Sequence, residues 1–125
     1  MNDIKKLQDS EIKVMNVVWR EQPVQARQVA EIMKAETGWN ANTTYTLIKR
    51  CVEKGAIERS EPGFTCRALV AREEVQREET DRLIDKIFDG SADKLFASLL
   101  GRKKLSPEKI SQLREMIDAL EREKK

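Results

Sequence analysis

The sequence has no histidine, only two cysteines and few aromatic residues, and these shortages exclude several classes of function. Without histidine, the chain has neither a Ser-His-Asp or Cys-His catalytic set nor a His-ligated zinc site. The two cysteines, Cys51 and Cys66, stand fifteen residues apart and do not make a metal site by themselves. The five glycines form no phosphate-binding loop, and the carboxylates follow the spacing of surface helices. The sequence therefore predicts no enzymatic activity, no cofactor and no metal site.

Long apolar runs are also missing. No stretch approaches the roughly 18 apolar residues that a membrane-spanning helix needs. The first residues, Met1 to Lys6, are polar and unlike a signal peptide. We therefore expect a cytoplasmic chain without membrane insertion, whose cysteines are reduced and packed in the interior.

What the 125 residues do contain is charge: 37% are charged and 39% are hydrophobic. The length indicates one domain, or one small domain with an appendage. The net charge of +2 produces no strong overall field, so any nucleic-acid binding must depend on where cations are placed. Residues 1–70 hold 11 basic and 9 acidic residues, whereas residues 71–125 hold 13 of each. The neutral second part favours protein–protein contact.

Residues 40–55 have the pattern most suggestive of function. Thr44, Leu47, Ile48 and Cys51 recur at helical spacing and predict a buried face. The opposite face and its flanks carry the candidate DNA-binding residues Asn42, Thr43, Tyr45, Thr46, Lys49 and Arg50. Short polar side chains can approach base edges, and cations neutralise phosphate. The pattern predicts a recognition helix, with a plain surface helix as the alternative.

The surrounding segments predict the usual setting of such a helix. Residues 9–21 and 25–36 read as two earlier helices, the first capped by Asp9 or Ser10. Asn40 can cap the third helix, and Gly55 fits the position just past its end. Three short helices with brief breaks match a helix-turn-helix layout.

Two short extended runs follow, residues 56–60 and 64–70. Pro62 and Gly63 suit the centre of a type II turn between them, so we expect a hairpin. A hairpin directly after a recognition helix is the wing of a winged helix. Arg59 and Arg67 are then candidates for phosphate contact, although solvated strand residues are an equally simple interpretation.

Residues 71–125 read as three amphipathic helices. Gly90 breaks the first, Ser91 can cap the second and Gly101 ends it, and Ser106 can cap the third. Three such helices are too small for a core of their own, so burial against a second copy is expected. The candidate dimerisation residues are Leu83, Ile84, Ile87, Phe88, Leu95, Leu99, Leu113, Ile117 and Leu120. The alternative is that these helices fold back onto the first domain.

The expected fold is therefore mainly α with a small β-hairpin. Residues 1–70 are predicted to form a winged helix-turn-helix DNA-binding domain, and residues 71–125 a helical dimerisation region.

Four segments resemble the penicillinase repressor family, which also includes copper-responsive repressors. They are Leu7–Trp19, Trp39–Arg50, Lys54–Gly55 with the following hairpin, and Leu105–Glu108. The resemblance covers nearly the whole chain. It implies a dimeric winged-helix repressor that binds double-stranded DNA at a palindromic operator. It also implies that the polar face of residues 42–50 contacts the DNA.

The chain departs from the family in two places. Antibiotic-responsive members are released by proteolysis at an Asn-Phe bond, and the corresponding bond here is Ser98–Leu99. The cysteine-rich tail of copper-responsive members is absent from the end of this sequence. The inducing signal, and whether release uses a regulatory protease, a membrane sensor or a ligand, stay open. An interaction adaptor without operator recognition is the alternative function.

Overall fold

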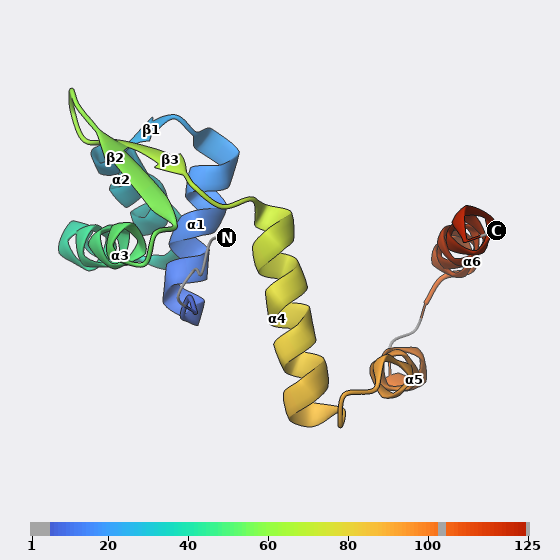
Figure 1. Cartoon of the computed structure of the whole chain (residues 1–125). Helices are drawn as coiled ribbons and strands as arrows, with labels where there is room; N and C mark the ends of the chain where they lie inside the picture. The colour runs from blue at the N-terminus through green and yellow to red at the C-terminus, as the bar shows by residue number, and fades with distance from the viewer. Residues whose placement is uncertain (1–5, 103–104, 125) are drawn as a thin grey trace. The chain divides into compact units, whose positions relative to one another are not determined.

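The computed structural model describes residues 6–102 and 105–124. It contains helices and short strands in the following order (Figure 1): α1 (Asp9–Glu21), β1 (Val24–Gln25), α2 (Ala26–Thr37), α3 (Ala41–Glu53), β2 (Ile57–Ser60), β3 (Thr65–Ala68), α4 (Arg72–Ile87), α5 (Ala92–Arg102) and α6 (Pro107–Glu123). The mainly helical fold with a small hairpin, as expected from the sequence, is confirmed. The chain divides into two compact units, Met1–Glu78 and Glu79–Lys125, with the division inside α4.

The first unit has a continuous apolar core beneath α1, α2 and α3. Side chains from all three helices are completely or almost completely buried, among them Met15, Val29, Met33 and Ile48. The apolar residues of α2 share one face and pack against α1 and α3. Val75 of α4 joins the same core, so the start of α4 belongs to this unit.

The sheet has three antiparallel strands in the order β1-β3-β2. Ile57 pairs with Ala68 and Ser60 with Thr65, which makes the predicted hairpin. Gly63 in its turn has a φ of 76°, the left-handed conformation expected there. The sequence did not reveal β1, because two residues after a proline carry no alternation. Val24 of β1 pairs with Cys66, on the edge of β3 that faces away from β2.

Two predicted helix ends were wrong. The first helix is capped by Gln8 rather than by Asp9 or Ser10, because the Gln8 N–H donates to Glu11 Oε1 at 2.7 Å. A glutamate at the third helical position can satisfy the capping residue's amide in this way. Gly101 does not end α5, which continues to Arg102, since a glycine late in a helix costs only about 1 kcal/mol. Ser91 and Ser106 do cap α5 and α6 as expected.

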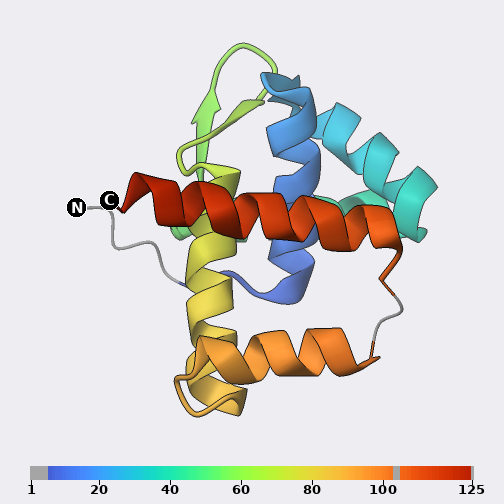
Figure 2. The same cartoon turned by 90° about the vertical axis from the view of Figure 1, so that its right-hand side faces the viewer.

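The second unit consists of the end of α4 with α5 and α6, each a regular helix (Figure 2). None of its described residues is buried. Large apolar side chains of α6 are between 37% and 66% exposed, and they include three of the predicted dimerisation residues, Leu113, Ile117 and Leu120. The two units therefore differ in the size of their buried core and not in their content of helix.

Candidate nucleic-acid interface

The site is built on α3, whose two faces differ as the sequence predicted. Thr44, Leu47, Ile48 and Cys51 are buried and hold the helix against the core. The opposite face is exposed, and it carries all six candidate residues of the helix: Asn42, Thr43, Tyr45, Thr46, Lys49 and Arg50. The helix is therefore fixed on one side and presents a polar surface on the other.

Both ends of α3 are closed by local hydrogen bonds. Asn40 Oδ1 accepts the Thr43 N–H at 2.9 Å, the predicted cap. Gly38 ends α2 in the left-handed conformation, which lets the chain turn within three residues. At the other end Gly55 has a φ of 83°, as expected for the residue after a helix. These caps keep the first and last turns of the polar face regular.

A buried ion pair ties the end of α3 to the beginning of α1. Glu11 is only 1% exposed, and its Oε1 lies 2.6 Å from Lys54 Nζ. Lys54 Nζ also donates to the Lys6 carbonyl at 2.8 Å. Burial alone would raise the pKa of Glu11, but the Gln8 N–H and the Lys54 ammonium outweigh it and hold that pKa below its ordinary value. The pair restrains the C-terminal end of α3.

Sequence reasoning missed this ion pair. Glu11 and Lys54 are 43 residues apart, Glu11 within α1 and Lys54 directly after α3. Nothing in the sequence around either residue points to the other, so only the folded chain brings them together. A glutamate three positions after a helix cap was the single available signal, and it indicates the cap rather than the partner.

The two cysteines are packing residues of this unit. Both are free and completely buried. Burial, with a smaller contribution from the Glu11 carboxylate, raises the pKa of Cys51 to about 12. Burial also raises the pKa of Cys66. Both thiols are therefore protonated and unreactive at neutral pH.

The two wing arginines leave the hairpin on opposite faces. Arg59 stands opposite Cys66 in the register, whereas Arg67 stands opposite Glu58. The Arg59 guanidinium lies 3.9 Å from the centroid of the Phe64 ring, a cation–π contact near the turn. Arg67 donates to Ser60 Oγ at 3.4 Å. Since neighbouring residues point to opposite faces, the two cations cover different surfaces.

Hollows border the exposed face of α3 on two sides. One, of about 370 Å³, is lined by Asn40, Asn42, Thr43, Thr46, Leu47 and Arg50. The other, of about 350 Å³, lies between α2 and α3, where Arg27, Lys34 and Tyr45 line it. Polar and cationic groups therefore extend from the face of α3 to both of its flanks.

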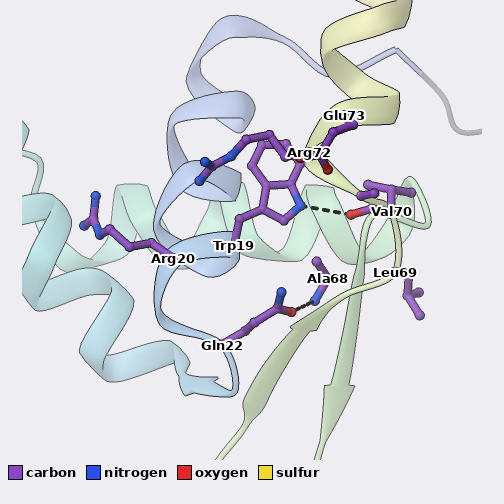
Figure 3. A pocket seen from close by; sticks show the side chains of 9 residues that line it. Trp19, Arg20, Gln22, Ala68, Leu69, Val70, Arg72 and Glu73 are labelled. Atoms are coloured by element: carbon purple, nitrogen blue, oxygen red, sulfur yellow. Dashed lines mark hydrogen bonds between the residues drawn. The ribbon is translucent and has the colours of Figure 1, made fainter. Parts of the chain in front are cut away.

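A separate hollow of about 640 Å³ lies where α1, β3 and α4 meet, and no residue of α3 lines it. Figure 3 shows how its side chains fix the connection into α4. Trp19 Nε1 donates to the Val70 carbonyl at 2.9 Å, and Gln22 Oε1 accepts the Ala68 N–H at 2.8 Å. The Arg72 guanidinium lies 5.6 Å from the centroid of the Trp19 ring. We call these contacts the α4 anchor.

Two other kinds of site are not found in residues 6–102 and 105–124. No group of three or more cysteine, aspartate or glutamate side chains there could hold a metal ion. No helix in these ranges is long and apolar enough to cross a membrane.

Comparison with known proteins identifies the family. The model of the penicillinase repressor family matches residues 7–119. The chain belongs to the penicillinase repressor family. The resemblance expected from the sequence is thereby confirmed, and so is the absence of enzymatic function, because the family consists of repressors.

Relatives within the penicillinase repressor family align over most of their length. The methicillin resistance regulatory protein MecI of Staphylococcus aureus (strain N315) is 25% identical over 119 residues, covering 94% of this chain and 97% of MecI. The penicillinase repressor of Bacillus licheniformis is 21% identical, covering all of this chain and 99% of that protein. An uncharacterised 16.5 kDa protein of Latilactobacillus sakei is 29% identical, covering 88% of this chain and 77% of its own length.

Solved structures support the winged-helix fold. The DNA-binding domain of the repressor BlaI has a TM-score of 0.54 and 24% identity, and it covers 59% of this chain and 93% of its own. The monomeric form of Bacillus licheniformis BlaI, solved in complex with the blaP half-operator, has a TM-score of 0.52 with the same identity and coverage. The likeness establishes the fold of the part of the chain that these structures cover.

Proposed function

We propose that this chain is a transcriptional repressor that binds a palindromic operator sequence-specifically as a homodimer. The observation that carries the proposal is the exposed face of α3, which presents short polar side chains and two cations on a helix fixed by its own core. Membership of the penicillinase repressor family supports the same function. The complex of the related BlaI with a half-operator supports DNA as the ligand.

In this proposal, the middle of the polar face reads the bases. At about 100° per residue, Asn42, Thr46 and Lys49 lie within roughly 60° of one another on α3. An α-helix fits the major groove, where these side chains can donate to or accept from base edges. Thr43, Tyr45 and Arg50 lie further round on the two flanks and contact the sugar–phosphate backbone. Arg59 and Arg67 contact phosphates from the wing.

The homodimer forms through the second unit. Its described residues bury nothing in the single chain, and its apolar side chains stand at helical spacing. Pairing with a second copy would remove this apolar surface from water, at about 25 cal/mol for each Å². The residues proposed for the interface are those expected from the sequence, from Leu83 in α4 to Leu120 in α6. A two-fold dimer presents two α3 helices and so matches an inverted repeat.

Selection of bound fragments from genomic DNA tests the operator. Purified full-length protein is expected to recover fragments that share one inverted repeat. Lys49→Ala and Arg50→Ala should weaken binding to that repeat without changing the circular dichroism spectrum, because both residues are exposed. A folded protein that enriches no motif would contradict operator recognition and favour the adaptor function. If both variants bound the operator as tightly as the wild type, the surface that contacts the bases would have to lie outside α3.

A further inference from the structure

The structure places two cations of α2 beside the recognition helix, a feature that sequence reasoning did not single out. Arg27 and Lys34 are seven residues apart on α2, so both lie on the same face, about 10 Å apart along the axis. Both are exposed, and both line the hollow between α2 and α3. Tyr45 of α3, which is 40% exposed, lines the same hollow.

These two cations have no acidic partner within the described ranges, unlike other cations of the same unit. Arg20 is paired with Glu21 and Glu36, and Lys54 is paired with Glu11. Neither Arg27 nor Lys34 forms an ion pair or a side-chain hydrogen bond with a residue in 6–102 or 105–124. Unpaired cations are free to bind an anion without first breaking an internal contact.

The geometry of α3 indicates which anion Arg27 and Lys34 face. Arg50 lies about 80° from Asn42 on one flank of the polar face, whereas Tyr45 lies about 60° away on the other. A helix in the major groove has one sugar–phosphate backbone on each side. Thr43 and Arg50 can contact the backbone on the first side. On the second side, Tyr45 is the flanking residue of α3, and it offers a hydroxyl but no positive charge. Since α2 packs against α3 along that second flank, its cations supply the missing positive charge.

We propose that Arg27, Lys34 and Tyr45 form a binding site for the DNA phosphate backbone that borders the major groove on the α2 side. The inference rests on the proposed function and adds the residues that hold the second strand. These residues position the duplex and do not read its sequence, because phosphates are the same at every base pair. Glu31 lies in the same hollow and opposes the site by its charge.

The test measures how the affinity depends on salt. Full-length wild type, Arg27→Ala, Lys34→Ala and the double variant are titrated onto two labelled duplexes at several KCl concentrations. One duplex contains the selected operator, and the other has the same length and an unrelated sequence. Each lost phosphate contact reduces the slope of log affinity against log salt by about 0.9. At roughly 0.1 M salt, this corresponds to about eightfold weaker binding for each cation removed. A substitution removes one cation from each copy of the dimer, so a single variant should bind about 60-fold more weakly.

Two features of the result distinguish phosphate contact from base reading and from a general loss of positive charge. Affinity should fall by the same factor on both duplexes, so that the preference for the operator is unchanged. Arg20→Ala is the matched control, because it removes one positive charge that is already paired and should leave the slope unchanged. Glu31→Gln should have the opposite effect and strengthen binding to both duplexes about twofold. Alanine favours helix, so circular dichroism should show the fold intact.

Each of the other outcomes has a definite meaning. A double variant with the wild-type slope and affinity overturns the site on α2. A loss confined to the operator duplex also overturns it, because the residues would then read sequence. If the wild type bound neither duplex in a salt-dependent way, the proposed function itself would fail. The inference and the function on which it rests are therefore tested separately.

Discussion

The two units of this chain have similar helices but very different interiors. The first buries side chains from α1, α2, α3 and the sheet in one core. The second buries none of its described residues, although α5 and α6 are amphipathic and α6 is well capped. Local signals such as caps and periodicity are therefore enough to define a helix even where none of its described residues is buried. The difference teaches that the first unit has a buried core of its own, whereas many apolar side chains of the second unit are exposed.

The largest expected effect follows from truncating Leu113, a side chain that is not part of the core of the first unit. Leu113→Ala in α6 removes apolar surface from both copies of the proposed dimer. At about 2 kcal/mol for each copy, the dissociation constant should rise about a thousandfold. Sedimentation equilibrium measures the change. Arg114→Ala, at the next position, which is also exposed, is the control and should leave the dimer unchanged. An unaltered dimer in Leu113→Ala would place the interface elsewhere.

The second truncation removes a side chain from the core of the first unit. Ile48→Ala removes a completely buried side chain of α3 and should lower the free energy of unfolding by about 3 kcal/mol. Denaturant unfolding followed by circular dichroism gives this value. The same substitution at Ile117, which is 54% exposed, should have little effect on the unfolding of the first unit. Equal destabilisation of the first unit by both variants would contradict the contrast between the units.

A third substitution tests the ion pair that restrains the end of α3. Lys54→Met leaves the Glu11 carboxylate buried without its partner, which should cost about 3 kcal/mol at neutral pH. Glu11→Gln combined with Lys54→Met should recover part of this loss, because no charge then stays buried. Thermal unfolding of the two variants compares them. A single variant as stable as wild type would show that the pair does not restrain the fold.

The same ion pair makes the stability of the first unit depend on pH in the acidic range. The pKa of Glu11 in the folded chain is below its ordinary value of 4.5. The stabilisation is therefore complete above that ordinary value and is lost as the pH falls through the lower, folded pKa. Wild type should lose stability in this acidic range, whereas the Glu11→Gln, Lys54→Met variant should lose less. Unfolding curves recorded from pH 7 to pH 3 make the comparison, and parallel losses in both proteins would exclude the carboxylate as the cause.

The smallest effect concerns a polar atom inside the first unit. Thr44 Oγ1 is buried in α3 and has no hydrogen-bond partner among the described residues. Thr44→Val keeps the shape and removes the unsatisfied hydroxyl, which should stabilise the unit by about 1 kcal/mol. The melting temperature should rise by a few degrees while operator affinity stays the same. A lower melting temperature would show that the hydroxyl has a partner in solution.

Several features of α3 could be predicted from the sequence because they depend on near neighbours. The alternation between Leu47, Ile48 and the polar residues fixes which face is buried. Asn40 caps α3 by accepting an N–H only three residues away, and Gly63 permits a turn between adjacent strands. Each of these signals lies within one helix or one hairpin, so the fold class and the polar face of the candidate site followed from them.

What the sequence could not predict depends on residues that meet only after folding. Glu11 lies in α1 and Lys54 directly follows α3, and β1 exists only because Val24 lies beside Cys66. Arg27 and Lys34 look like ordinary surface cations until α2 is packed against α3. The Gln8 cap was missed for a different reason, because glutamine is rare at that position and its amide is satisfied by the side chain of Glu11.

The α4 anchor has a consequence for optical measurements. The chain has two tryptophans, Trp19 and Trp39, and both belong to the first unit. Trp19 is held in the anchor beneath Arg72, whereas Trp39 precedes the cap of α3 and lies beneath Lys13. The indole emission of the whole chain therefore originates beside the start of α4 and beside the start of α3. With Trp39 replaced by phenylalanine, tryptophan fluorescence would report only on the start of α4, beside which Trp19 lies. Residues 79–125 have no tryptophan and would not contribute to this emission.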